Sequence, residues 1–373
     1  MESNAYMRLI STNVLKEKMV IGRTIWNEAG LPLLHKKAVI TEGIIRRLKQ
    51  LNIKYVYIED TISSGIEIVE TVPSEVRNKA VDHIKNSFKE VREAKGKYAS
   101  YILDEHSKLI SSIVDDLLNA ITNSKEMLMI LSDAYLYDEY LYQHSFQVTL
   151  YSVATAKEMG YSKEDQRLIG IGAMLHDIGK IVIPTEILNK PGKLREEEFE
   201  EMKQHTRYGF DILRNLHTVS LLVAHCAFQH HERMDGSGYP RGIQGMDLHP
   251  FARIIGVADV FDAVTSNRIY REKLLPSEGL KIIEAGSGKG FDERVVNAFK
   301  RIIVTYPNGI VLHLSDGRRG VVARQNKKQP TRPFVRIFEE DGKILSATYE
   351  IALHQYPHIH ILKEEPDYTN VQE

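Results

Sequence analysis

Histidine and aspartate residues recur through the middle of this chain in segments that are otherwise apolar. His176 and Asp177 stand side by side in IGIGAMLHDIGKI, and Lys180 follows one helical turn after His176. An apolar helix does not need such a polar cluster to form its core. Histidine offers a neutral nitrogen ligand and aspartate two oxygens that can bridge, so adjacent residues of these types could serve two metal ions. Lys180 would then face the same site and contact a phosphate.

More residues of the same two kinds follow. His205 lies in EEFEEMKQHTRYG, and His230 and His231 end the run SLLVAHCAFQHHE. Asp259 interrupts the apolar segment FARIIGVADVFDAV, where a carboxylate needs a compensating partner that metal ligation could supply. A single histidine is better explained as a core or surface residue, but recurring clusters weaken that explanation. This mixed nitrogen and oxygen set suits iron or manganese, and also zinc, better than magnesium.

The segment HHERMDGSGYP, with the HD pair before it and ADVFDAVTSNRIYR after it, resembles the HD-GYP domains. These are a branch of the HD metal phosphohydrolases that hydrolyses the bacterial messenger cyclic di-GMP. The likeness covers roughly residues 138 to 302, and its motifs are long and stand in the family's order. It implies a helical HD-type bundle and, as metal ligands, His176, Asp177, His205, His230, His231 and Asp259.

The resemblance also implies roles for the remaining motif positions. Asp177 would bridge the two metal ions, and Lys180 would act beside it in catalysis. Arg268 and Arg271 would bind the substrate phosphates. The loop that names the family contains Asp235, Gly236, Gly238, Tyr239 and Pro240. We expect Glu232 and Asp235 to orient the histidines through hydrogen bonds, and a signalling protein could bind at this loop.

The reaction expected from this resemblance is hydrolysis of cyclic di-GMP to pGpG, GMP or both, by a hydroxide that bridges two divalent metal ions. One alternative is a catalytically weak module that senses cyclic di-GMP, and another is an HD hydrolase of a different nucleotide. The complete ligand set favours catalysis over sensing. The GYP segment argues against a different nucleotide.

The number of metal ions follows from the helix that precedes the HD pair. Some HD-GYP proteins hold a third metal with a glutamate four residues before a histidine on that helix. The matching histidine here is His144, but Tyr140 stands at the glutamate position. Glu139 lies about 100° away around a helix, and a neutral phenol is a poor ligand. We therefore expect two metal ions per chain, with His144 and Tyr140 lining the substrate pocket.

The bulk composition limits the partners and the setting. With 49 basic and 50 acidic residues and a net charge of −1, the chain lacks the excess of positive charge that polynucleotide-binding proteins carry. No segment approaches the length of a membrane span, and the single cysteine, Cys226, suits a reducing compartment. We expect a cytoplasmic protein that does not bind membranes.

The 373 residues exceed the usual size of one core, so several domains are expected. Residues 1–72 form a small α+β domain of regulatory type, in which Thr41 is expected to cap a helix. Residues 73–134 are a helical linker, which could form a homodimer stalk or pack on the neighbouring domain. The catalytic domain covers 135–305, where Asp292 is expected to cap a further helix, and residues 306–373 form a β-rich appendage.

Overall fold

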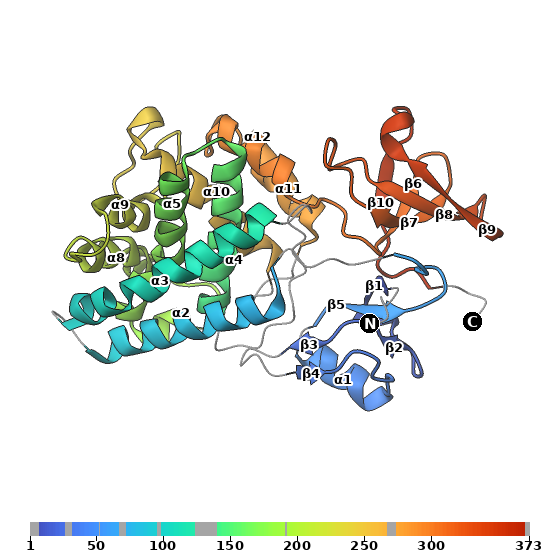
Figure 1. Ribbon diagram of the computed structural model, residues 1–373, viewed down its shortest axis with the longest axis horizontal. Helices are drawn as coiled ribbons and strands as arrows, with labels where there is room; N and C mark the ends of the chain where they lie inside the picture. The colour runs from blue at the N-terminus through green and yellow to red at the C-terminus, as the bar shows by residue number, and fades with distance from the viewer. Residues whose placement is uncertain are drawn as a thin grey trace. The chain divides into compact units, whose positions relative to one another are not determined.

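The structure is a computed structural model that describes residues 7–26, 32–51, 53–66, 72–94, 98–123, 140–190, 192–266 and 274–369. Two compact units are present, one built from both ends of the chain and one from its middle (Figure 1). The middle is helical, and small sheets lie in the N-terminal and C-terminal parts. This confirms the expected fold class: mainly α, with a small α+β N-terminal part and a β-rich C-terminal part.

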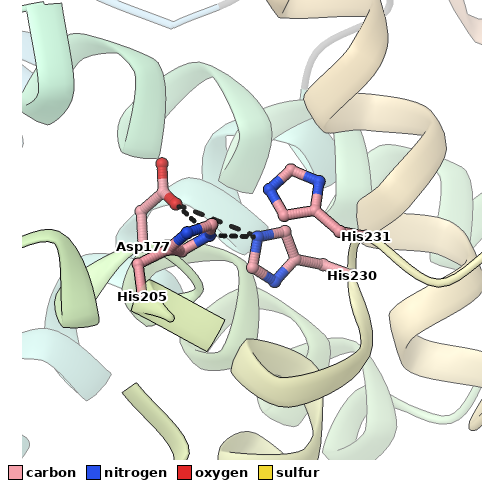
Figure 2. Close-up of side chains that lie close together, drawn as sticks. All are labelled: Asp177, His205, His230 and His231. Atoms are coloured by element: carbon pink, nitrogen blue, oxygen red, sulfur yellow. Dashed lines mark hydrogen bonds and ion pairs between the residues drawn. The ribbon is translucent and has the colours of Figure 1, made fainter. Parts of the chain in front are cut away.

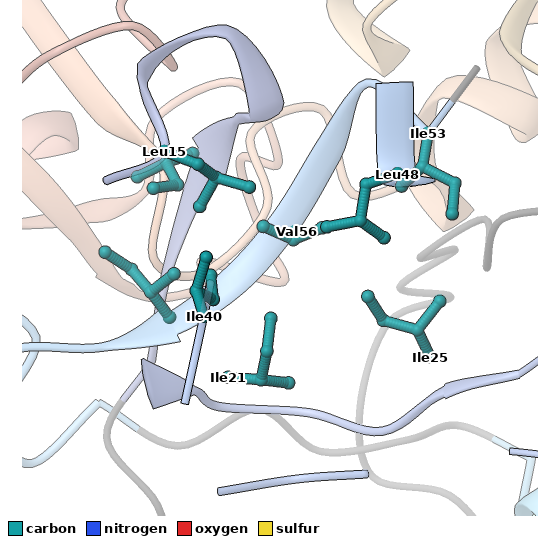
Figure 3. Close-up of a cluster of buried hydrophobic side chains, with 9 residues drawn as sticks. Leu15, Ile21, Ile25, Ile40, Leu48, Ile53 and Val56 are labelled. Atoms are coloured by element: carbon teal, nitrogen blue, oxygen red, sulfur yellow. The ribbon is translucent and has the colours of Figure 1, made fainter. Parts of the chain in front are cut away.

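The N-terminal part forms a short antiparallel sheet with one helix. Strand β5 (Tyr55–Glu59) pairs with β1 (Met7–Ser11) on one side and β2 (Val20–Ile21) on the other. A 3₁₀ turn, η1 (Thr12–Val14), and a second small hairpin, β3 (Ile25–Trp26) with β4 (Pro32–Leu34), precede helix α1 (Glu42–Gln50). As expected, Thr41 caps α1, because its hydroxyl accepts a hydrogen bond of 3.3 Å from the Ile44 amide. Isoleucine, leucine and valine side chains from these elements form the core in Figure 3.

The C-terminal part is a five-stranded antiparallel sheet in the order β10-β6-β7-β8-β9. Its elements are β6 (Val311–Leu314), β7 (Arg319–Arg324), β8 (Phe334–Glu340), β9 (Lys343–Ala352), the 3₁₀ turn η4 (Leu353–Gln355) and β10 (Ile361–Glu364).

The two ends of the chain share a core, although the sequence suggests separate modules. Ile66 is buried against Val311 and Phe338. The Leu9 amide donates to the Gly309 carbonyl at 3.0 Å. The N-terminal sheet therefore folds together with the C-terminal sheet.

The helical unit begins with two long helices, α2 (Ser74–Ala94) and α3 (Tyr98–Asn123). They pack against each other and against α4 (Tyr140–Glu158) and α5 (Lys163–Leu175). Ala80, Ile84, Phe88 and Val91, which share one face of α2, are buried. Of the two arrangements that the sequence left open for these helices, this is packing on the neighbouring domain and not a free dimer stalk. Homodimer formation through residues 73–134 stays a prediction.

The remaining elements of this unit carry the motif residues. They are α4 (Tyr140–Glu158), α5 (Lys163–Leu175), η2 (Ile178–Val182), α6 (Thr185–Leu188), α7 (Glu196–Lys203), α8 (His205–Leu213), α9 (Leu221–Gln229), η3 (Gly245–Asp247), α10 (Pro250–Thr265), α11 (Pro276–Ala285) and α12 (Glu293–Ile302). Asp292 caps α12 as expected, accepting a 2.9 Å hydrogen bond from the Arg294 amide. In the described part of the chain, no helix combines the length and apolar character needed to cross a membrane.

Candidate metal centre

The HD pair lies where a buried helix gives way to a tight turn. Helix α5 ends at Leu175, His176 is its C-cap, and Asp177 opens η2. Gly179 lets this turn approach α8 closely, because a Cβ at that position would overlap the carbonyl oxygen of His205. The two motif residues are thereby brought against the start of α8, and both are buried.

Backbone carbonyls orient three of the histidines. The Nδ1 atoms of His176 and His205 each lie 2.6 Å from a carbonyl oxygen three residues earlier in the chain. His230 Nδ1 lies 2.9 Å from the carbonyl oxygen of Ala227. If Nδ1 carries the proton in these bonds, each Nε2 presents a lone pair to the interior of the site.

The first cluster contains Asp177, His205, His230 and His231, whose ligand atoms lie within 4.8 Å of one another. Figure 2 shows the rings of His205 and His230 beside the Asp177 carboxylate. Asp177 Oδ1 is 3.4 Å from His205 Nε2 and 3.8 Å from His230 Nε2. Three segments distant in sequence thus bring candidate ligands together: the turn after α5, the start of α8 and the end of α9.

The second cluster contains His144, His176 and Asp259 within the same limit of 4.8 Å. His144 Nε2 is 3.1 Å from Asp259 Oδ1 and 3.6 Å from Asp177 Oδ2. His176 Nε2 is 3.4 Å from the same Asp177 oxygen. Asp177 therefore directs Oδ1 to one cluster and Oδ2 to the other.

The protonation states suit metal binding in the first cluster. Burial lowers the pKa of His205 to about 4 and places the pKa values of His230 and His231 well below their usual range. Burial alone would raise the pKa of Asp177, but the charge of Lys180 beside it holds that pKa well below its usual range. Neutral imidazoles and charged carboxylates are the forms that bind metals.

His144 differs from the other histidines. Burial opposes its protonation, but hydrogen bonds to Asp259 and Asp262 prevail and raise the pKa of His144 to about 9. The same interaction with His144 holds the pKa of Asp259 well below its usual range, against the effect of burial. Without a metal, a proton on His144 therefore offsets part of the carboxylate charge.

Two buried atoms test whether a metal fits this site. His176 Nε2 and Asp177 Oδ1 are fully buried and make no hydrogen bond. Leaving such groups unsatisfied is costly, and a cation in each cluster would satisfy them, since Asp177 Oδ1 faces the first cluster and His176 Nε2 the second. The donor set is nitrogen and carboxylate oxygen, as first-row transition metals prefer. The residues fit divalent metal ions.

Lys180 lies beside the clusters, as its spacing from the HD pair suggests. Its Nζ is 2.5 Å from Asp177 Oδ2, and its side chain is partly exposed. The lysine therefore borders both the buried carboxylate and the solvent.

Glu232 and Asp235 make hydrogen bonds within the GYP loop and not to the histidines. Glu232 does not orient a histidine, since its carboxylate oxygens accept hydrogen bonds from the Arg241 amide at 2.8 Å and the Ile243 amide at 3.2 Å. Asp235 bonds Ser237 within the loop instead. The expectation that these acids orient the histidines was wrong, because both carboxylates hold the loop itself. Backbone carbonyls lie at the Nδ1 atoms of His176, His205 and His230 instead. Gly238 is required where a Cβ would overlap the His231 carbonyl.

Three of the expected site positions are not described. Arg268 and Arg271 lie outside the described residues, and so does the side chain of Tyr140, whose backbone opens α4. His144, expected to line the pocket, lies inside the second cluster.

Asp262 is a site residue that the sequence analysis missed. It is buried, and its Oδ2 lies 2.7 Å from His144 Nδ1. The sequence contained a signal for this role, because Asp262 is a second acidic residue in the apolar helix of Asp259, three positions later.

Comparison with known proteins identifies the family to which this chain belongs. A profile of the HD domain matches residues 125–295, and one described as a KOW domain associated with HD domain matches residues 311–367. A cyclic di-GMP phosphodiesterase of Pseudomonas aeruginosa is 31% identical over 319 residues, which are 80% of this chain and 76% of that protein. This chain belongs to the HD-GYP phosphodiesterase family. As a member of that family it is an HD-type phosphodiesterase.

Other relatives of this HD-GYP phosphodiesterase match over shorter stretches. The cyclic di-GMP phosphodiesterase of Thermotoga maritima is 39% identical over 61% of this chain and 60% of its own length. The 3′3′-cGAMP-specific phosphodiesterase 3 of Vibrio cholerae is 36% identical over 44% of this chain and 36% of its own length. The chain thus spans less than two thirds of these two relatives.

Proposed function

We propose that this chain hydrolyses cyclic di-GMP at a binuclear metal centre, giving pGpG, GMP or both. The observation that carries the proposal is the position of Asp177, whose two oxygens face two separate groups of histidine and aspartate side chains. The names of the Pseudomonas and Thermotoga relatives support the choice of substrate.

One divalent ion would be held by the first cluster. The second would be held by His144, His176 and Asp259 with the other oxygen of Asp177. His144 is proposed as a ligand here, in place of the pocket role expected from the sequence, because its Nε2 faces both carboxylates. Iron or manganese suits this donor set best, and zinc is acceptable. Such ions would activate water and neutralise charge on the phosphoryl oxygens.

Side chains around the clusters would handle the remaining charge of the phosphodiester. Lys180 is proposed to stabilise the negative charge that develops on the phosphoryl oxygens during attack. Its partial exposure allows Nζ to turn from Asp177 to a bound phosphate. Arg268 and Arg271 are proposed as further phosphate contacts, and Tyr140 as a residue at the pocket entrance.

The proposed setting is the cytoplasm, with a signalling protein bound at the GYP loop and a homodimer formed through residues 73–134. Ile84 and Phe88 are buried within the helical unit and would not be available to a second chain. A dimer would use exposed positions of these helices, such as Tyr101, which is 61% exposed.

Substrate choice is tested by incubating metal-loaded protein with cyclic di-GMP, 3′3′-cGAMP or pGpG and separating the products by chromatography. We expect cyclic di-GMP to be cut faster than 3′3′-cGAMP, and Asp177→Asn to abolish the reaction. Asp341→Asn, the same change at an exposed turn between β8 and β9, is the matched control and should retain activity. Binding of cyclic di-GMP without cleavage would favour the sensor alternative, and faster cleavage of 3′3′-cGAMP would favour the activity named for the Vibrio relative.

A further inference from the structure

A row of aromatic rings leads from the first cluster to the protein surface. The ring of Tyr239 lies over His231, with centroids 4.7 Å apart and planes inclined by 32°. Phe199 meets Tyr239 edge to face at 6.4 Å and is 45% exposed. A partly exposed phenylalanine so close to a buried polar site needs a reason, since its burial would be favourable.

A cation accompanies these two rings. Lys203 Nζ lies 4.8 Å from the centroid of Phe199 and 5.7 Å from that of Tyr239. Its nearest carboxylate is Glu200, at 2.6 Å. The surface beside the cluster therefore combines two aromatic rings with an ammonium group.

The parts that carry these side chains are fixed to the metal centre. Helix α7 supplies Phe199 and Lys203, and its Met202 carbonyl orients the cluster residue His205. Its first turn is anchored by Glu198, which accepts a 2.7 Å hydrogen bond from the Arg195 amide. Tyr239 is held by the loop that Glu232 fastens. Hydrogen bonds thus hold Phe199 and Tyr239 in place beside the first cluster.

We propose that Phe199 and Tyr239 form a stacking site for a guanine base of the substrate, with Lys203 facing the negative oxygens of the same nucleotide. Planar bases stack on aromatic side chains, and an exposed ring beside a phosphodiester site offers the surface for it. The cation suits an anionic substrate. This inference rests on the proposed function, because it assumes that a guanine nucleotide occupies the site.

The test compares binding of GMP and ribose 5-phosphate to metal-loaded protein by calorimetry. The two probes share a phosphate, and GMP adds the base, so their affinity ratio isolates the contribution of the base. Phe199→Leu should reduce GMP affinity by about tenfold and leave ribose 5-phosphate unchanged. Phe199→Trp should keep the GMP affinity, and its added indole fluorescence should be quenched by GMP. Tyr356→Leu, which removes an exposed aromatic ring from the C-terminal part, is the matched control and should change neither affinity.

Three results would overturn the inference. Equal weakening of both probes, or loss of metal in Phe199→Leu, would show that Phe199 only supports the site. An unchanged GMP affinity would mean that the exposed ring serves another contact, such as a protein partner. A different result would contradict the proposed function itself: wild-type protein with both metals bound would leave cyclic di-GMP uncut.

Discussion

Asp262 holds His144 by a hydrogen bond of 2.7 Å between Oδ2 and Nδ1. The other oxygen of Asp262 accepts a 2.8 Å hydrogen bond from the Ser266 hydroxyl. The carboxylate is thereby fixed at both ends, and it directs His144 Nε2 to Asp259 and Asp177. His144 differs in this from His176, His205 and His230, whose Nδ1 atoms lie beside backbone carbonyl oxygens.

Removing that carboxylate should weaken one metal site selectively. Asp262→Ala is expected to lower affinity at the second cluster by about 10- to 100-fold, because an outer partner orients the ligand. Asp262→Asn, which keeps a hydrogen-bond acceptor, should lose less metal affinity than Asp262→Ala. Metal content after dialysis against a graded chelator measures this, and Asp247→Ala, at an exposed position of η3, is the control. Full retention of both ions by Asp262→Ala would contradict the assigned role.

The sequence could not reveal this pair because its two residues lie 118 positions apart, on α4 and α10. Ligand types and motif spacing were enough to bring together His176, Asp177 and Asp259, since buried acids and paired histidines need partners wherever the chain leads. The partners of His144 depend on how two helices pack, and no local pattern encodes that. The shared core of the two chain ends depends on long-range packing in the same way.

Lys180→Ala should separate charge stabilisation from metal binding. Lys180 neighbours Asp177 without belonging to either cluster, so both ions should remain bound. Turnover should fall by about 10²- to 10³-fold, the usual cost of losing one group that stabilises charge in the transition state. Steady-state rates and metal content of the same preparation provide the measurement, with the exposed Lys193→Ala as control. Metal loss in Lys180→Ala would assign the lysine a structural role.

Gly179→Ala should disturb the packing that assembles the first cluster. The added methyl group would overlap the His205 carbonyl and the Gly209 amide, so η2 and α8 must separate. We expect a loss of about 1–3 kcal/mol in unfolding free energy, as for other overpacked sites, with reduced metal content. Denaturant unfolding checks this against Gly43→Ala, where a Cβ meets no atom closer than 3.8 Å. Equal stability of both variants would show that the close approach is dispensable.

The metal-free protein should lose stability in mildly alkaline solution. The pKa of His144 is raised from 6.5 to about 9, so its protonated form stabilises the fold fully below pH 6.5 and ceases to do so as pH rises through about 9. Melting temperatures of chelator-treated protein should therefore fall over this range, and His144→Gln should flatten the fall. An identical slope in the variant would assign the effect to other groups.

The central feature of the proposed mechanism is a pair of metal ions that share Asp177, and activity measured against bound metal tests it directly. Metal-free protein is titrated with manganese or ferrous iron, and cyclic di-GMP hydrolysis is recorded at each measured ratio of metal to chain. We predict little activity until the first site fills, full activity at two ions per chain, and neither activity nor binding at that ratio in Asp177→Ala. Full activity with one ion, a requirement for a third, or normal metal binding by Asp177→Ala would contradict the account.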